Sequence, residues 1–256
     1  MLSIVCWKWE PELGSKHPEK RSLFSIAHVN ILRAMVERNL SIPHRFVCVT
    51  DDHRGLHSSI KFVHIDRHFY RHAELGGCYR RLKAFDEATA MVHFGPRFVS
   101  IDLDTVVTEN LDSIFGFQGD FRIWEDQHRR FTPYCGSLWG MDAGARGYVW
   151  DSFNSDPGAS IRKASKYQGT DQAHISACLY PKERTWTKED GIWNFNTEVR
   201  RCPSRVFRRG GETITECNRK GDLPKGSRLV FFNGKFDPSQ EQLWKHHPWI
   251  RDFWHE

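Results

Sequence analysis

The first half of the chain alternates short apolar runs with longer amphipathic segments, and this alternation is the strongest constraint on its fold. Residues 3–9, 45–50 and 60–65 are rich in β-branched and aromatic side chains, as buried strands are. Residues 22–39 and 80–92 have the apolar spacing of helices, and Ser22 is a candidate N-cap. Because strands that alternate with helices pair in parallel, we expect an α/β fold with a mostly parallel sheet.

Two aspartates, Asp102 and Asp104, stand where the apolar run 98–101 gives way to the β-branched run 105–107. If this segment stays extended, both side chains point to the same side. Neighbouring carboxylates supply the hard oxygen ligands that Mg²⁺ and Mn²⁺ prefer, and ligands of parallel sheets bind beyond the carboxyl ends of strands. The pair is therefore a candidate metal site, although a solvated turn is the better explanation when the pair is taken alone.

Length and composition favour one globular domain. The 256 residues can bury a substantial core, and they hold no apolar run of the roughly 18 residues that a membrane helix needs. The N-terminus lacks a basic segment and a cleavage site, so we expect no signal peptide. The seven cysteines are scattered without a Cys-x-x-Cys pair, which indicates reduced thiols and a cytoplasmic protein.

Charge and missing motifs narrow the range of ligands. The net charge of +5 fits an anionic ligand such as a nucleotide diphosphate, and it would not repel nucleic acid. No Gly-x-Gly-x-x-Gly follows the first predicted strand and no Walker loop is present, which argues against a dinucleotide-binding fold and a P-loop enzyme.

The second half holds further candidate segments. Strands are predicted at residues 121–124, 137–141 and 228–232, short strands within 192–207, helices at 144–153 and 170–179, and a packed helical tail at 240–256. Thr170 is a candidate N-cap with Asp171 in the first turn; alternatively, Asp171 and Gln172 present a carboxylate and an amide to a sugar. Gly234 and Lys235 follow the last strand, either in a plain turn or in a loop that closes over phosphates.

Taken together and in order, these segments resemble the family 8 (glycogenin-like) glycosyltransferases of the A-type fold, in particular the compact bacterial and phage-borne members. The resemblance spans about residues 3–248 and rests on residues 45–52, 79–82, 101–105, 169–172 and 231–235. It implies a single-domain, Rossmann-like A-type fold with a mostly parallel central sheet flanked by helices. Residues 1–115 would form the nucleotide-binding half, and residues 116–256 the acceptor-side half with the C-terminal tail.

The resemblance also implies an activity. Such a hexosyltransferase moves a sugar from a nucleotide-sugar donor, most often a UDP-sugar, with retention of configuration and with Mn²⁺ or Mg²⁺ on the diphosphate. Asp171 and Gln172 match the motif that lies against the donor sugar, and they are the expected catalytic residues. The expected metal ligands are Asp102, Asp104 and Asn233. The expected donor contacts are Cys6, Trp7, Lys8, Thr50, Asp51, Arg81, Asp102, Gly234 and Lys235.

Two segments depart from the family pattern. The third metal ligand of the family is commonly a histidine near the C-terminus, but Phe231 and Asn233 stand in the corresponding places. Asn233 could coordinate through its amide oxygen, and His246 and His247 are the alternatives. Residues 134–137 replace the Asn-Ser-Gly-type segment that usually contacts the donor sugar, so the identity of the sugar stays open.

Other functions also fit the sequence. Residues 200–209 and 244–254 are basic and aromatic, as segments that bind nucleic acid are. The chain could be a nucleic-acid-associated protein, including a phage enzyme that glycosylates a modified base in DNA. A third alternative is a non-catalytic member of the fold. The acceptor cannot be read from the sequence, because acceptor sites are built from variable loops.

Overall fold

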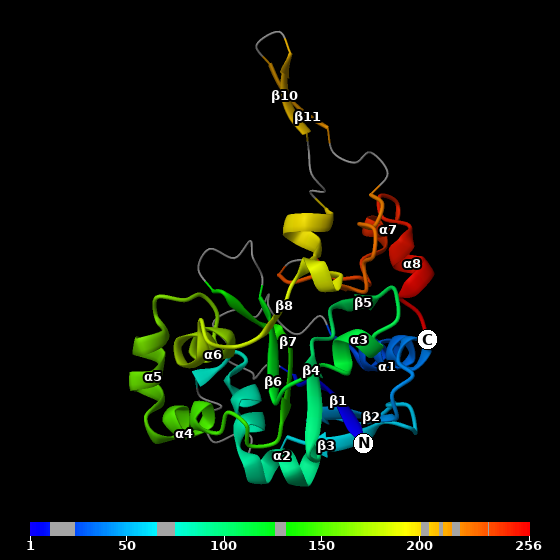
Figure 1. Ribbon diagram of the computed structural model, residues 1–256. Helices are drawn as coiled ribbons and strands as arrows, with labels where there is room; N and C mark the ends of the chain where they lie inside the picture. The colour runs from blue at the N-terminus through cyan, green and yellow to red at the C-terminus, as the bar shows by residue number, and fades with distance from the viewer. Residues whose placement is uncertain are drawn as a thin grey trace.

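The computed structural model describes residues 1–10, 24–65, 75–125, 132–200, 205–209, 212–216, 221–234 and 236–256 (Figure 1). The elements of these segments follow in chain order: β1 (Leu2–Lys8), α1 (Ile26–Asn39), β2 (His44–Thr50), β3 (Lys61–His64), η3 (Tyr79–Phe85), α2 (Glu87–His93), β4 (Arg97–Ile101), β5 (Thr105–Val107), α3 (Asp112–Phe115), β6 (Phe121–Glu125), β7 (Tyr134–Asp142), α4 (Tyr148–Ser155), α5 (Pro157–Ala164), α6 (Asp171–Leu179), β8 (Thr185–Trp186), η4 (Lys188–Asp190), β9 (Ile192–Asn194), η5 (Phe195–Val199), β10 (Arg205–Arg209), β11 (Glu212–Glu216), β12 (Leu229–Phe231), α7 (Glu241–Trp244) and α8 (Trp249–Phe253).

A seven-stranded sheet in the order β3-β2-β1-β4-β7-β6-β8 forms the centre of the molecule. The pairs β3–β2, β2–β1, β1–β4 and β6–β8 are parallel, whereas β7 runs antiparallel to both of its neighbours. Helices lie on both sides of this sheet in Figure 1. The predicted α/β fold with a mostly parallel central sheet is therefore confirmed.

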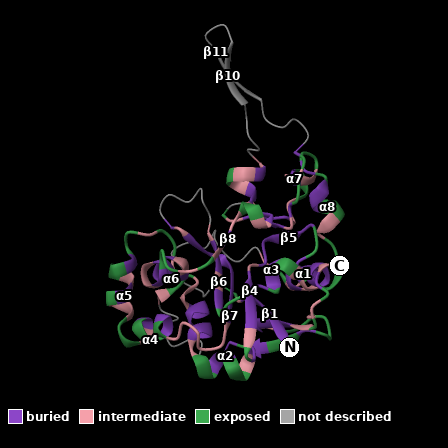
Figure 2. Ribbon diagram, viewed as in Figure 1, coloured by how far each residue is buried: buried purple, intermediate pink, exposed green. Residues whose placement is uncertain are grey.

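Both faces of the central sheet are covered, as the continuous apolar runs predict. Every residue of β1 is buried, and successive side chains enter different cores. Ile4 and Cys6 belong to the core shared with α1, whereas Val5 and Trp7 belong to the core shared with η3 and α4. Figure 2 shows the buried strands inside and the exposed residues on the surrounding helices.

A smaller sheet in the order β5-β12-β9 lies next to the carboxylate pair. β5 pairs antiparallel with β12, and β12 pairs parallel with β9. Beyond this ladder, the backbone N–H of Phe232 donates to the carbonyl oxygen of Asp104 at 2.8 Å. The chain leaves the large sheet after Ile101 and enters the small sheet at Thr105. Asp102 and Asp104 thus occupy a junction between two sheets and not one continuous strand, which corrects the extended geometry considered from the sequence.

The prediction of one continuous helix at residues 80–92 is wrong. These residues form a 3₁₀ segment, η3, followed by α2, and the break falls at Asp86, whose φ of −70° and ψ of 117° are extended. The Asp86 carboxylate accepts from the backbone N–H of Thr89 at 3.1 Å and so caps α2. The side chain of an aspartate is an alternative partner for the backbone, which is why it ends one helix and starts the next.

Other boundaries also differ from the prediction. α1 begins at Ile26 with Ser25 as its N-cap, and the predicted cap Ser22 lies outside the described residues. The helix predicted at 144–153 is α4, which starts at Tyr148, and α5 follows it without having been predicted. Asp156 before Pro157 is the usual start signal of a helix, and the Asp156 carboxylate accepts from Ala159 N–H at 2.8 Å.

The C-terminal third is only partly as expected. The predicted short strands within 192–207 are β9 and the beginning of the β10–β11 hairpin, with the π-helical turn η5 between them. The predicted tail helix is divided into α7 and α8. In the described part of the chain, no helix combines the length and the hydropathy needed to cross a bilayer.

Gly140 in β7 generates a stability prediction. A Cβ atom at this position would lie 2.6 Å from the ring of Phe117, which is buried and stacks under the Arg97 guanidinium. We expect Gly140→Ala to lower the free energy of unfolding by about 1–3 kcal/mol, because the ring cannot move away freely. Urea denaturation measures this change.

Gly158→Ala in α5 is the matched control. Its Cβ would approach the end of the Arg162 side chain at 3.3 Å and Asp156 Oδ1 at 3.4 Å, with no backbone atom or ring of another described element nearby, so helix propensity should dominate and stabilise the protein by up to about 1 kcal/mol. Equal unfolding free energies for the two variants would contradict the packing described for β7.

Candidate active site

The candidate site is organised by the guanidinium of Arg81, which lies between two carboxylates. Arg81 Nη1 donates to Asp102, directly after β4, and Arg81 Nε and Nη2 both contact Asp171 Oδ2 at 2.7 Å. The side chains of Arg81 and Asp171 are buried, whereas that of Asp102 is 24% exposed. This contact brings together η3, the end of β4 and the start of α6, at the carboxyl edge of the sheet where ligands of such folds bind.

The charges of this cluster stabilise one another. Burial opposes the charge of Arg81, but Asp102 and Asp171 outweigh it and raise the pKa of the guanidinium well above its ordinary value. Burial also raises the pKa of Asp171, and the nearby Arg81 counteracts part of that shift. Arg81 is therefore a fixed cation inside an otherwise acidic site.

Asp104 is buried beside this cluster. Its Oδ1 atom has no hydrogen-bond partner among the described residues. Burial, followed by the charges of Asp102 and Asp237, raises the pKa of Asp104 well above its ordinary value. A buried carboxylate without a donor is costly, so this position favours either a proton or a bound cation.

Asp237 is a second buried carboxylate near Asp104, and it belongs to none of the motifs singled out in the sequence. Its Oδ1 atom lies 3.1 Å from His28 Nε2 and accepts from Ser239 N–H at 2.8 Å, whereas its Oδ2 atom has no partner among the described residues. Burial acts to raise the pKa of Asp237, but the bonds from His28 and Ser239 lower it overall. This carboxylate is thus held in place and keeps one oxygen available.

The donor set fits a divalent cation that a substrate helps to bind. The charges of Asp102 and Asp237 act on Asp104, and the charge of Asp102 also acts on Asp171. In the described residues no three His, Cys, Asp or Glu side chains already surround a common point. Mg²⁺ and ions like it often take only one or two carboxylates and complete their shell with waters and phosphate oxygens, so Asp104 with Asp102 or Asp237 would suffice.

Asn233, the expected third ligand, already has partners. Its Oδ1 atom accepts from Ser137 Oγ at 3.0 Å, and its Nδ2 atom lies 3.7 Å from Cys135 Sγ. Of the alternative ligands, His247 is buried with Nδ1 3.2 Å from Gly221 O, and His246 is exposed. The amide of Asn233 is therefore committed to β7, although it stays close to the candidate site.

Gln172 lies beside the same strand. Its Oε1 atom is 3.5 Å from Gly136 N–H, and its Nε2 atom donates to Gln168 O at 3.1 Å. Gly136 belongs to the segment 134–137 that departs from the family pattern: a Cβ there would lie 2.9 Å from Arg81 Nη2 and 3.2 Å from Asp171 Oδ2. The absence of a side chain at this position lets the guanidinium lie against β7.

The residues expected to contact the nucleoside divide into two groups. The side chains of Cys6 and Trp7 are buried; burial and the neighbouring Cys48 raise the pKa of the Cys6 thiol, and Trp7 Nε1 donates to Ser100 Oγ at 2.9 Å. These two residues serve the core and can offer a ligand only their backbone.

Lys8, Thr50 and Asp51 form the second group, at the carboxyl ends of β1 and β2. Lys8 and Thr50 are direct neighbours in the sheet. Lys8 Nζ lies 3.0 Å from a carboxylate oxygen of Glu10, whose backbone N–H donates to Asp51 Oδ2 at 2.8 Å. These polar groups share the sheet edge with Asp102. Gly234 is exposed with a φ of +103°, and Lys235 lies outside the described residues.

The aromatic tail packs onto the protein body. Trp244 Nε1 donates to Pro238 O and Trp249 Nε1 to Gly221 O, each at 2.8 Å, and Trp249 is buried. These indole rings are therefore not free platforms for bases. The other basic segment, residues 200–209, lies partly outside the described residues, and the side chains of β10 are not described.

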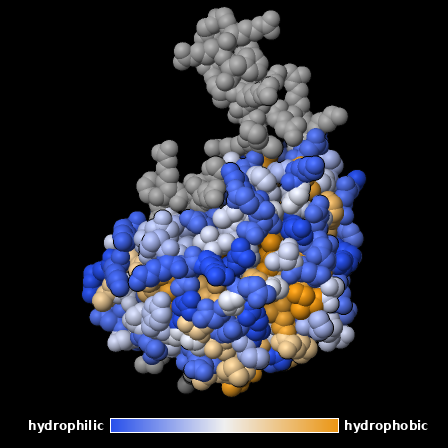
Figure 3. All heavy atoms as spheres, viewed as in Figure 1, coloured by the Kyte–Doolittle hydropathy of each residue, from blue (hydrophilic) through white to orange (hydrophobic). Residues whose placement is uncertain are grey.

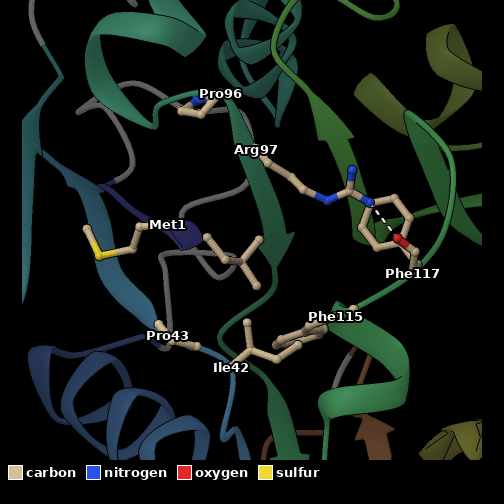
Figure 4. A pocket seen from close by; sticks show the side chains of 9 residues that line it. Met1, Ile42, Pro43, Pro96, Arg97, Phe115 and Phe117 are labelled. Atoms are coloured by element: carbon tan, nitrogen blue, oxygen red, sulfur yellow. Dashed lines mark hydrogen bonds between the residues drawn. The ribbon is translucent and has the colours of Figure 1, made fainter.

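A shallow apolar pocket of about 410 Å³ lies away from this chemistry, at the amino ends of the strands (Figure 4). Met1, Pro43 and Phe115 line it, and Arg97 crosses it to donate to Phe117 O. Figure 3 shows apolar residues gathered on this side of the molecule, near α3 and the N-terminus. Because ligands of such sheets bind at the opposite edge, the pocket is not part of the candidate site.

Comparison with known proteins supports the fold. No protein-family profile matches the chain, and no curated protein sequence matches it. A crystal structure of the galactosyltransferase LgtC in complex with donor and acceptor sugar analogues is similar, with a TM-score of 0.60 and 11% identity over 98% of this chain and 94% of LgtC. An active-site mutant of LgtC gives a TM-score of 0.55 with 10% identity over 92% and 89%. The chain therefore has the fold of LgtC, and the predicted A-type glycosyltransferase fold is confirmed.

Asp104 makes the stability of the metal-free protein depend on pH. Because its pKa is raised in the folded state, the folded protein binds more protons than the unfolded chain above the ordinary pKa of about 3.9. The contribution of Asp104 to stability therefore falls as the pH rises from the ordinary pKa of an aspartate toward the higher pKa of Asp104 in the folded protein. We expect Asp104→Asn to remove this term, so that its advantage over the wild type in EDTA grows with pH.

Unfolding midpoints of the two proteins at several pH values between 4 and 8 measure this difference. Asp142→Asn is the matched control, because Asp142 lies at the opposite edge of the sheet and pairs with Arg97. A difference between Asp104→Asn and the wild type that stays constant with pH would contradict the proposed environment of Asp104.

Proposed function

We propose that this chain is a metal-dependent glycosyltransferase that moves a sugar from a nucleotide-sugar donor, with a UDP-sugar as the first candidate, to an acceptor with retention of configuration. The observation that carries the proposal is the Asp102–Arg81–Asp171 cluster at the carboxyl edge of an LgtC-like sheet, next to buried Asp104, whose Oδ1 atom has no hydrogen-bond partner among the described residues. LgtC itself has been crystallised with donor and acceptor sugar analogues.

The charge balance supports metal dependence. Asp102, Asp104 and Asp171 outnumber the one guanidinium among them, so a nucleoside diphosphate would bring further negative charge into an acidic site. Away from water, the repulsion between these carboxylates and the diphosphate would be strong, and a divalent cation between them would offset it. Asp104 and Asp102 would hold Mn²⁺ or Mg²⁺, which when bound neutralises the charge that develops on the leaving diphosphate.

The donor would lie across the carboxyl edge of the sheet. Lys8, Thr50 and Asp51 are at the ends of β1 and β2, on the side of β4 that is opposite to β7, and they would bind the nucleoside. In this arrangement residues 1–115 supply most of the nucleotide site, and residues 116–256 supply the sugar and acceptor side.

Asp171 and Gln172 would orient the donor sugar. Arg81 holds Asp171 Oδ2, so the carboxylate cannot turn and its other oxygen is directed by Thr170 Oγ1 at 3.3 Å. Gln172 places an amide one residue later, at the start of α6. A carboxylate acceptor and an amide fixed in this way can bind sugar hydroxyl groups and exclude other orientations, which is the main contribution that pre-organised groups make to a transfer reaction.

A ligand screen tests this function. Thermal shifts with UDP-, GDP-, ADP- and CMP-sugars, each with Mn²⁺ and with EDTA, should identify a donor that stabilises the protein only when the metal is present. With that donor we expect Asp104→Ala to abolish both sugar transfer and metal-dependent UDP binding, and Asp142→Ala to change neither. Transfer by Asp104→Ala at the wild-type rate would exclude the proposed mechanism.

A further inference from the structure

Asp237 stands out because it is buried, rigid and incompletely bonded. Only 1% of the residue is exposed, and Oδ1 is held by His28 Nε2 and by the backbone and hydroxyl of Ser239. Oδ2 is also buried, but no donor reaches it from the described residues. A carboxylate oxygen in this condition is costly unless something positive binds to it.

The backbone brings the start of the segment that carries Asp237 to Asp104. Strand β12 pairs with β5, so Phe231 lies opposite Thr105, and Phe232 N–H donates to Asp104 O at 2.8 Å. The loop that carries Asp237 therefore starts directly at Asp104. On its other side, His28 comes from the buried face of α1, which packs against β5.

Asp104 and Asp237 share the same unusual condition. Each residue is more than nine-tenths buried, each has an oxygen without a partner among the described residues, and the negative charge of Asp237 acts on Asp104. The fold therefore keeps two buried, mutually repelling carboxylates near each other. Asp102, by contrast, already has Arg81 as its cation.

We propose that Asp237, positioned by His28 and Ser239, faces the divalent cation together with Asp104 and supplies the ligand that the sequence led us to expect from Asn233. This inference rests on the proposed function, since it assumes that the site takes a cation. Asn233 Oδ1 already accepts from Ser137 Oγ at 3.0 Å, whereas Asp237 Oδ2 has no such donor. Waters and diphosphate oxygens would complete the coordination shell.

Mn²⁺ binding to the full chain tests the assignment without any measurement of activity. Free Mn²⁺ is followed by electron paramagnetic resonance, with and without UDP, for the wild type and for single variants. We expect Asp237→Asn and Asp104→Asn each to weaken Mn²⁺ binding by about tenfold or more, and His28→Gln to weaken it by a smaller factor because it only positions the carboxylate. Asn233→Ala and the distant control Asp142→Asn should bind Mn²⁺ like the wild type.

The outcomes separate this inference from the function on which it rests. Wild-type affinity in Asp237→Asn, with affinity lost in Asp104→Asn, would overturn the role of Asp237 and leave the proposed function intact. No Mn²⁺ binding to the wild type, even with UDP, would overturn the metal dependence as well. If Asp237→Asn does not fold, Ser239→Ala keeps the carboxylate but removes one of its anchors; it should weaken Mn²⁺ binding, and unchanged affinity would contradict the inference.

Discussion

The ion pairs of Arg81 are the interaction on which the candidate site depends. One guanidinium joins η3, the end of β4 and the start of α6, elements that are distant in the sequence. Neither Asp171 nor Arg81 is exposed enough for water to replace the missing partner, and the loss of one member of a buried pair typically costs about 3–5 kcal/mol. The same ion pairs therefore set the geometry of the site and hold these three elements together.

Gly136 shows how closely the sheet accommodates this pair. Strand β7 passes the guanidinium at a distance that leaves no room for a Cβ atom, and Gln172 approaches the same glycine from α6. The antiparallel strand β7 thus leaves space for the guanidinium, and the ends of β4 and α6 supply the carboxylates. A site of this kind is rigid before a ligand arrives, which reduces the ordering that binding must impose.

Apart from the two carboxylates that Arg81 contacts, the site holds buried negative charge that the described residues balance only in part. Asp104 and Asp237 keep buried oxygens without donors in the described part of the chain, at the junction between the large and the small sheet. Natural proteins retain such costly arrangements mainly at functional sites, where a ligand supplies the missing interaction. The excess of negative charge is the observation on which the proposed cation depends.

The sequence by itself determined the class of the fold and the presence of the acidic residues. Continuous apolar runs indicate strands that are buried on both faces, which favours a largely parallel sheet. Asp102 and Asp171 stand in local motifs, whereas Arg81 is expected only from the family resemblance. The tertiary structure decided what local patterns cannot encode. Asp86 breaks a predicted helix because its side chain competes for the backbone, and Asp237 acts on Asp104 across 133 positions because β12 pairs with β5. Contacts between residues more than a hundred positions apart depend on strand pairing and packing, and these follow from the whole chain rather than from any one segment.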